Sequence, residues 1–183
     1  MSRLILCIVG PSCAGKTTSA EYIQERRDTD HFEASEFVKS RYSNSTFSGS
    51  LMEFVKTEFD REGKETFARP VCGEISEADE SEAIISGFRT KQEVDFIKKK
   101  FSDVLVVGLY ANSLLRYQRK LRRDNPESEY EYQDFLQKDF IEYNFGIMEM
   151  FDSEEDILIV NEGTLDNLYT TIDEQILSKI DSN

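Results

Sequence analysis

The chain opens with an apolar run, Leu4 to Val9, that leads directly into the residues GPSCAGKT at positions 10–17. These eight residues fit the pattern G-x-x-x-x-G-K-[ST] at every fixed position. A continuous apolar run of this length is typical of a strand buried on both faces. A buried strand that passes through such a loop into a helix predicts the first unit of a parallel α/β domain. The loop itself predicts a phosphate-binding site.

Each fixed position of this loop has a physical purpose. The glycines let the backbone curl so that its N–H groups point inward at phosphate oxygens, and the following helix offers its positive end to the same anion. Lys16 is expected to reach the β- and γ-phosphates, and the Thr17 hydroxyl to bind Mg²⁺. The predicted phosphate-binding residues are Gly10, Ser12, Cys13, Ala14, Gly15, Lys16, Thr17 and Thr18.

Strands and helices alternate along the rest of the chain. Further strands are predicted at 31–33, 83–85, 104–107 and 157–160. Helices are predicted at 15–27, 35–42, 51–70, 94–101, 114–121, 136–150 and 165–176, with an acidic loop at 74–82. This order predicts a doubly wound α/β fold with a parallel sheet covered on both faces. A length of 183 residues suits one domain spanning residues 1–183.

The formal net charge of −14 is unevenly distributed. Residues 124–183 hold 17 acidic and two basic residues, whereas residues 1–123 hold 19 acidic and 20 basic ones. This balance argues against a general nucleic-acid binder, which needs a basic face. The acidic last third is expected to be a solvated surface, with a protein partner there as an open alternative.

Cys7, Cys13 and Cys72 show no C-x-x-C spacing, which favours free thiols in a reducing compartment. The first apolar run is too short to span a membrane. We therefore expect a soluble, cytoplasmic protein without membrane contact. His31, the only histidine, is expected to be structural, and no Cys/His metal site is predicted.

A basic cluster follows the 104–107 strand, with the cations Arg116, Arg119, Lys120, Arg122 and Arg123. The spacing of Arg116, Arg119 and Arg123 places them on one helix face. Arginines of this kind stabilise the charge of a migrating phosphoryl group. We expect Arg119 and Arg123 to contact the nucleotide. The alternative is an exposed basic face that pairs with the acidic last third.

These features occur in an order that resembles a known group of enzymes. Besides the phosphate loop, the resemblance rests on ISGFR at 85–89, the arginine helix and VNEGTL at 160–165. The chain resembles nucleoside-monophosphate kinases and dephospho-CoA kinases, and looks closest to an uncharacterised group of small P-loop proteins related to them. The resemblance implies ATP and Mg²⁺ as cofactors and a five-stranded sheet in the order 2-3-1-4-5. It also implies an acceptor-binding section at about 34–76 and a lid at about 116–132.

The same resemblance implies roles for further residues. Lys39 would hold the acceptor phosphate where the family has arginine, with Arg69 and Arg89 as further acceptor contacts. Lys16, Arg89, Arg119 and Arg123 would form the catalytic set. Asn161 and Gly163 follow the last strand, where the family packs a loop on the adenine.

One departure from the family concerns Ser86, which stands where the family commonly has aspartate. Serine supplies no negative charge, so either Glu33 or Glu36 takes over that role or turnover is weak. The leading hypothesis is an ATP-dependent phosphotransferase that acts on a small nucleotide-like acceptor. A nucleotide-binding regulatory module on a kinase fold is the second, and a kinase of nucleic-acid ends is the third.

Overall fold

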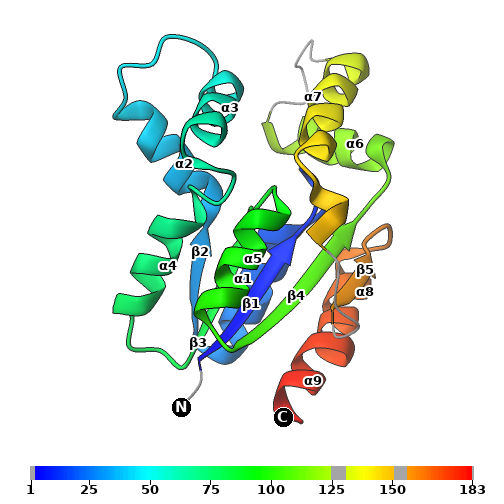
Figure 1. Ribbon diagram of the computed structural model, residues 1–183. Coiled ribbons are helices and arrows are strands. Elements are labelled where there is room, and N and C mark those ends of the chain that lie inside the picture. Colours follow the sequence, from blue (N-terminus) through cyan, green and yellow to red (C-terminus); the bar gives the residue numbers. More distant parts are fainter. Residues whose placement is uncertain (1–2, 125–130, 151–155, 183) are drawn as a thin grey trace.

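The computed structural model describes residues 3–124, 131–150 and 156–182. Its centre is a five-stranded sheet in the order β2-β3-β1-β4-β5, and every strand pairing is parallel (Figure 1). The strands are β1 (Leu4–Val9), β2 (Asp30–Glu33), β3 (Glu82–Ser86), β4 (Asp103–Tyr110) and β5 (Ile157–Val160). The predicted fold class and strand order are therefore confirmed. β4 is longer than the predicted 104–107 strand because it continues through Gly108 to Tyr110.

Helices cover both faces of this sheet. They are α1 (Lys16–Arg27), α2 (Ala34–Ser43), α3 (Leu51–Glu62), α4 (Ala68–Glu77), α5 (Lys91–Lys100), α6 (Ser113–Asp124), α7 (Tyr132–Asn144), α8 (Leu165–Ile172) and α9 (Ser178–Asp181), with the short helical segments η1 (Ile147–Met150) and η2 (Asp173–Leu177). Side chains of α4, α5 and η1 pack on one face of the sheet, and those of α1 and α8 pack on the other.

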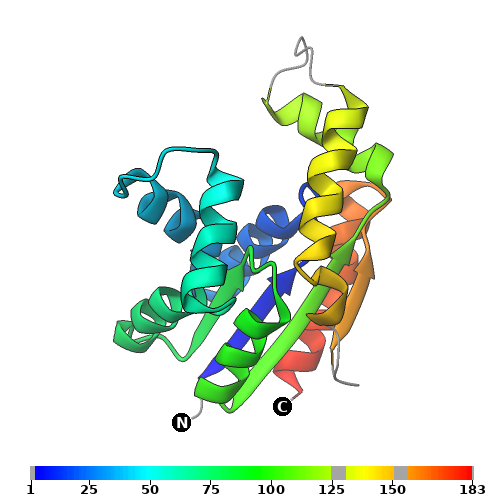
Figure 2. The same ribbon diagram turned by 45° about the horizontal axis from the view of Figure 1, so that its top comes forward.

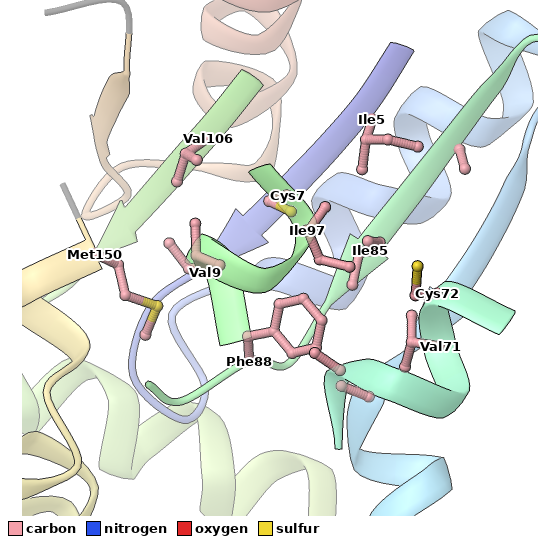
Figure 3. Close-up of a cluster of buried hydrophobic side chains, with 14 of the residues drawn as sticks. Ile5, Cys7, Val9, Val71, Cys72, Ile85, Phe88, Ile97, Val106 and Met150 are labelled. Carbon is pink, nitrogen blue, oxygen red and sulfur yellow. The ribbon is translucent and has the colours of Figure 1, made fainter. Parts of the chain in front are cut away.

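The central strand β1 is apolar throughout because helices cover both of its faces. Ile5, Cys7 and Val9 point into the core under α4 and α5, whereas Leu6 and Ile8 point into the core under α1 and α8 (Figure 3). Burial raises the pKa of the Cys7 thiol to about 12, so this cysteine behaves as a small apolar side chain. All three cysteines are free thiols, as predicted.

Two helical arms rise from the sheet at the end where β1 runs into the phosphate loop. Figures 1 and 2 both show α2 with α3 on one side of that loop and α6 with α7 on the other. Because all strands are parallel, their carboxyl ends meet at this same edge. The two arms therefore lie on either side of the carboxyl edge of the sheet, where the loops after the strands lie.

The prediction of one helix over residues 51–70 was wrong, because this stretch contains the end of one helix and the start of another. α3 begins at a capping box between Ser50 and Glu53 and ends before Gly63, whose φ of +93° lies in the left-handed region. The chain restarts as α4, which carries Pro70 in its first turn, where the missing N–H costs nothing. α4 continues to Glu77, so the prediction of a loop at 74–82 was wrong for its first four residues.

The prediction of a single helix with one apolar face at 136–150 was also wrong. α7 ends at Asn144, before Gly146 with its φ of +102°, and η1 follows as a separate turn. The helical spacing of Leu136, Phe140 and Tyr143 predicts that they share a buried face. Phe140 is instead 69% exposed, and the buried α7 residues are Phe135 and Asp139. A buried ion pair of Asp139, described below, explains which face α7 turns inward.

In the closing helix, the helical spacing of Leu165, Leu168, Ile172 and Ile176 predicts one apolar stripe. Leu168, Ile172 and Ile176 are buried against the sheet, whereas Leu165 is 52% exposed. The segment from Leu165 to Asp181 is helical throughout and passes through a π-turn at η2. Within the described residues, no helix is long and apolar enough to cross a membrane.

The core position of Ile97 on α5 predicts a measurable loss of stability on truncation. Ile97 is fully buried, so Ile97→Ala should lower the free energy of unfolding by about 2–5 kcal/mol because it leaves a cavity. Urea unfolding followed by circular dichroism measures this change. The matched control is Leu158→Ala, since Leu158 is 56% exposed and its truncation should cost less than about 0.5 kcal/mol. Equal losses in the two variants would contradict this assignment of the core.

Candidate functional site

The phosphate loop folds back on itself at the end of β1, and two glycines make this possible. Gly10 has a φ of +142°, and a Cβ built there would lie 2.2 Å from the Leu109 carbonyl oxygen. Gly15 has a φ of +110°, and a Cβ there would lie 2.4 Å from Asn161 Nδ2. Gly15 is also the N-cap of α1, without a side-chain cap. The first N–H groups of α1 therefore remain available to an anion.

Lys16 lies buried beneath the loop. Its Nζ donates hydrogen bonds to the carbonyl oxygens of Gly10 and Pro11, both at 2.9 Å. Burial, and to a lesser extent the nearby Arg89 guanidinium, lowers the pKa of Lys16 to about 7. A bound phosphate would stabilise the charged ammonium and raise this pKa again.

A cavity of about 800 Å³ opens above the loop. Its lining contains four arginines and two carboxylates besides Lys16, so its net charge is positive even when Lys16 is neutral. The lining residues are Ser12, Cys13, Gly15, Lys16, Thr17, Thr18, Glu21, Glu33, Ser35, Gly87, Arg89, Arg119, Arg122, Arg123, Asn161, Gly163, Thr164, Leu165 and Leu168. Most of the predicted nucleotide-binding residues therefore meet in one cavity, although Gly10 and Ala14 lie behind its wall.

The predicted acceptor residues are not all brought together. Arg89 lines the cavity, and its Nη1 donates to the Gly10 carbonyl oxygen at 3.3 Å. Lys39 is exposed on α2 and is not part of the lining. Arg69 is 51% exposed on α4 and pairs with Glu65 at 2.9 Å, also outside the cavity. The acceptor role of these last two residues remains a prediction.

The backbone of Arg89 is fixed by the buried carboxylate of Glu93, which the sequence analysis did not predict. Glu93 accepts hydrogen bonds from the N–H groups of Arg89 and Thr90, at 2.9 and 3.0 Å, and forms the capping box of α5. Burial raises the pKa of Glu93 to about 7. The spacing Thr90-x-x-Glu93 is the sequence signal that could have identified this helix start.

Ser86 does not face the cavity. It is 1% exposed, and its hydroxyl is hydrogen-bonded to His31 Nε2 at 2.8 Å. Burial lowers the pKa of His31, which favours its neutral form and fits the structural role predicted for it. Glu33 is paired in register with Ser86, lines the cavity and accepts a hydrogen bond from Ser35 Oγ at 2.6 Å. Of the two predicted substitute carboxylates, Glu33 reaches the cavity, whereas Glu36 is exposed elsewhere on α2.

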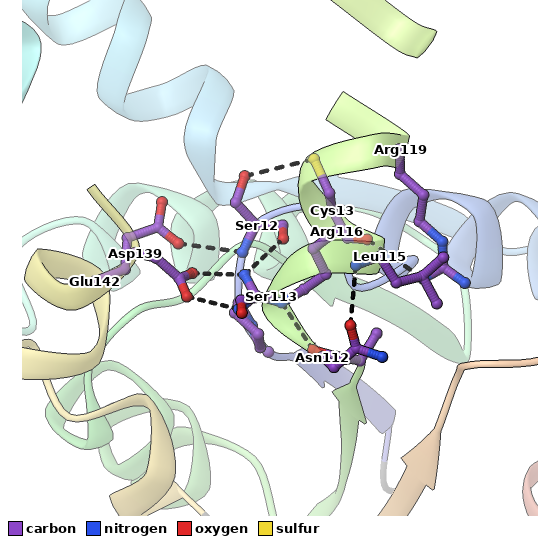
Figure 4. Close-up of polar contacts among 12 residues, drawn as sticks. Ser12, Cys13, Asn112, Ser113, Leu115, Arg116, Arg119, Asp139 and Glu142 are labelled. Carbon is purple, nitrogen blue, oxygen red and sulfur yellow. Dashed lines mark hydrogen bonds and ion pairs between the residues drawn. The ribbon is translucent and has the colours of Figure 1, made fainter. Parts of the chain in front are cut away.

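Arg116 has a different environment from the other arginines of α6. It is 1% exposed and forms two hydrogen bonds with the Asp139 carboxylate, at 2.5 and 2.6 Å (Figure 4). Its Nε donates to the Ala111 carbonyl oxygen at 2.8 Å, and its Nη1 to that of Ser12 at 3.2 Å. Arg116 therefore ties α6, α7 and the phosphate loop together and does not line the cavity.

Arg119 and Arg123 both line the cavity, as expected for nucleotide contacts. Arg119 Nη2 donates to the Asn161 carbonyl oxygen at 2.9 Å, and Asn161 Nδ2 donates to that of Ala14 at 2.9 Å. The loop after β5 is thereby joined to the arginine helix and to the phosphate loop. Arg122, which the sequence reading did not single out among the cations, lies in the same lining.

The donor set fits a nucleoside triphosphate and a magnesium ion. Loop N–H groups, Lys16 and arginines suit phosphate oxygens. Thr17 and Glu33 offer oxygen atoms in the same cavity. Mg²⁺ commonly binds through one or two protein oxygens together with substrate phosphates and water. Within the described parts of the chain, no group of three or more His, Cys, Asp or Glu side chains could hold a metal ion.

Comparison with protein families assigns the chain. A family model described as "AAA domain" matches residues 6–140. The chain belongs to this family. A UPF0200 protein of Thermoplasma volcanium is 31% identical over 116 residues, which is 63% of each chain. A UPF0200 protein of Pyrobaculum aerophilum is 25% identical over 158 residues, which is 86% of this chain and 87% of the relative. The chain thus spans less than two thirds of the first of these relatives.

Solved structures share the fold at low sequence identity. A gluconokinase from Sinorhizobium meliloti is 11% identical with a TM-score of 0.67, covering 98% of this chain and 94% of the other. A shikimate kinase from Acinetobacter baumannii is 20% identical with a TM-score of 0.58, covering 97% and 94%. These likenesses confirm the predicted P-loop kinase fold and the resemblance to small kinase-like proteins.

The buried ion pair between Arg116 and Asp139 predicts that removing one of its two charges greatly lowers the free energy of unfolding. Asp139→Asn should lower the free energy of unfolding by about 3–5 kcal/mol, because it leaves the Arg116 charge buried without compensation. Urea unfolding measures this loss. The double variant Arg116→Met/Asp139→Leu removes both charges and should recover most of it. A loss below about 1 kcal/mol for Asp139→Asn would contradict the structural role of the pair.

The lowered pKa of Lys16 predicts proton uptake when ATP binds. At pH 8 the free protein, with a Lys16 pKa of about 7, holds mostly the neutral amine, and bound phosphates favour the ammonium. The ATP dissociation constant should therefore rise above pH 7, by up to about tenfold per pH unit. Calorimetry at pH 8 in buffers of different ionisation enthalpy measures the protons taken up. Lys16→Arg is the control, since its guanidinium stays charged, and equal uptake in both proteins would refute the interpretation.

Proposed function

We propose that this protein is an ATP- and Mg²⁺-dependent phosphotransferase that acts on a small, nucleotide-like acceptor. The observation that carries the proposal is the convergence of the phosphate loop, Lys16 and several arginines on one cavity at the carboxyl edge of the sheet. In parallel α/β folds this edge is where ligands bind. The family and the fold support a phosphotransferase, because solved kinases share this architecture.

In this proposal the parts of the cavity have separate tasks. The loop N–H groups and Lys16 bind the β- and γ-phosphates, and the Thr17 hydroxyl would hold Mg²⁺. Mg²⁺, when bound, neutralises charge that develops on the phosphates. Arg119 is hydrogen-bonded to Asn161, which precedes Gly163 and Leu165 of the lining, so this end of the cavity suits the nucleotide's base. Arg122 and Arg123 line the same cavity and suit phosphate oxygens.

The other end of the cavity suits the acceptor. Glu33, Ser35 and Arg89 lie there, next to Gly87 and below the α2–α3 arm. Arg89 can stabilise the migrating phosphoryl group, and Glu33 can orient the acceptor or accept its proton. Glu33 thereby supplies the carboxylate that Ser86 lacks. Catalysis would consist mainly of positioning and charge stabilisation.

The second candidate is a nucleotide-binding regulatory module with little turnover. The observation in its favour is that Ser86 is buried and hydrogen-bonded to His31, so the usual carboxylate of β3 is absent. The acidic last third of the chain could then contact a protein partner. Acceptor-stimulated ATP consumption distinguishes the two candidates.

Variants of Lys16 and Glu33 test the proposal together with an acceptor panel. ADP formation from Mg-ATP is measured with nucleoside monophosphates, their deoxy forms, dephospho-CoA and a 5′-hydroxyl oligonucleotide. One acceptor should stimulate ADP formation, and Lys16→Ala should reduce that rate by at least about 100-fold because it removes a phosphate contact. Glu33→Gln should reduce the rate by a similar factor and leave ATP affinity within about twofold.

The control variant is Lys56→Ala, which removes an exposed lysine of α3 that lies outside the cavity. Its rate and its thermal unfolding should match those of the unmodified protein. Tight ATP binding without stimulation by any acceptor would favour the regulatory module. An unchanged rate in Lys16→Ala would refute both the kinase and the role of the loop.

A further inference from the structure

A carboxylate from α7 lies against the phosphate loop. Glu142 Oε2 accepts a hydrogen bond from the Ser12 backbone N–H at 3.1 Å (Figure 4). The same oxygen lies 3.3 Å from Arg89 Nη1. The Glu142 side chain is only 15% exposed, and that of Arg89 25% exposed. Glu142 does not belong to the cavity lining and approaches from the α7 side.

The partners of Glu142 are groups that the proposed reaction needs. Arg89 lines the cavity, and the Ser12 N–H belongs to the phosphate loop. Guanidinium and backbone N–H groups bind carboxylate and phosphate oxygens in the same way. Glu142 therefore holds an anionic oxygen on donors that suit a phosphate.

A second contact from α7 reaches the same residue of the loop. Asp139 lies one turn before Glu142, and it holds Arg116, which donates to the Ser12 carbonyl oxygen. α7 thus contacts both backbone groups of Ser12: Glu142 accepts from its N–H, and Asp139 acts on its carbonyl oxygen through Arg116 (Figure 4).

These two contacts differ in strength. The Arg116–Asp139 pair is bidentate, with distances of 2.5 and 2.6 Å, and is buried. Glu142 makes one longer hydrogen bond and one 3.3 Å ion pair, and it is closer to solvent. A terminal phosphate carries more negative charge than a carboxylate, so it competes well for Arg89. The Glu142 contact is the one of the two that a nucleotide can displace.

We propose that Glu142 is an autoinhibitory latch that occupies Arg89 and the Ser12 N–H until the terminal phosphate of a nucleotide displaces it. This inference rests on the proposed function, because it takes the displacing anion to be the phosphate of ATP. Displacement frees Arg89 for the phosphoryl group and releases the last turn of α7 from the loop. The Arg116–Asp139 pair meanwhile keeps α7 attached.

The test compares ligand affinities of the unmodified protein and Glu142→Gln by calorimetry with Mg-ATP and with adenosine. Glutamine keeps the size of the side chain and removes its charge. The variant should bind ATP about two- to fivefold more tightly, the size expected when a partly exposed ion pair no longer has to be broken. Adenosine affinity should not change, since adenosine carries no phosphate.

The matched control is Asp134→Asn, which removes an equal charge from an exposed position of the same helix. Its ATP affinity should stay within experimental error of the unmodified protein. If Glu142→Gln unfolds, Glu142→Asp serves instead, because its shorter side chain withdraws the carboxylate and should also tighten ATP binding.

Unchanged or weaker ATP binding in the Glu142 variants would overturn the latch. Weaker binding would instead make Glu142 a support that positions the loop. A protein that binds ATP but transfers no phosphate would contradict the proposed function and leave the affinity comparison valid. Absence of ATP binding in both the unmodified protein and the variant would overturn both proposals.

Discussion

The close approach of the backbone at Gly10 to the neighbouring strand is the constraint on which the site depends. With no side chain there, the chain leaves β1 tightly against Leu109 of β4 and curls into the phosphate loop. Any larger residue would meet the Leu109 carbonyl oxygen and push the loop away from the sheet. The same curl places the Gly10 and Pro11 carbonyl oxygens where Lys16 Nζ can reach them. Close packing and hydrogen bonds therefore join the strand, the loop and the start of helix α1.

The arginines of α6 point in different directions, and this decides their roles as much as their spacing in the sequence does. Arg116 turns into the protein and is neutralised by Asp139, whereas Arg119, Arg122 and Arg123 turn toward the cavity. The acidic last third thus does more than cover the surface, because one of its carboxylates fixes the helix that carries the cations. The alternative of an exposed basic face does not describe Arg116, which is buried in its pair with Asp139. The nucleotide contacts of Arg119 and Arg123 stay a prediction.

The fold and the phosphate loop could be predicted from sequence because their signals are local. A buried strand, a glycine-rich loop and alternating elements each occupy a short stretch of chain. The roles of Arg116 and Glu142 could not be predicted, because both depend on contacts more than 20 residues away along the chain. The buried face of α7 could not be predicted for the same reason. The apolar spacing predicts a different face, whereas the observed one contains a charged residue, Asp139, that is buried through its pair with Arg116. Glu33 was recognisable only as one of two candidates until the register of β2 was known.

Asn161 gives the cavity a further property. Its N–H donates to the Tyr110 carbonyl oxygen at 2.7 Å, its side chain donates to that of Ala14, and its own carbonyl oxygen accepts from Arg119. One residue thus joins the end of β4, the phosphate loop and the arginine helix. Such preorganisation lowers the conformational entropy lost on association. For the proposed nucleotide, the wall at this end of the cavity is therefore already assembled by hydrogen bonds between these three elements.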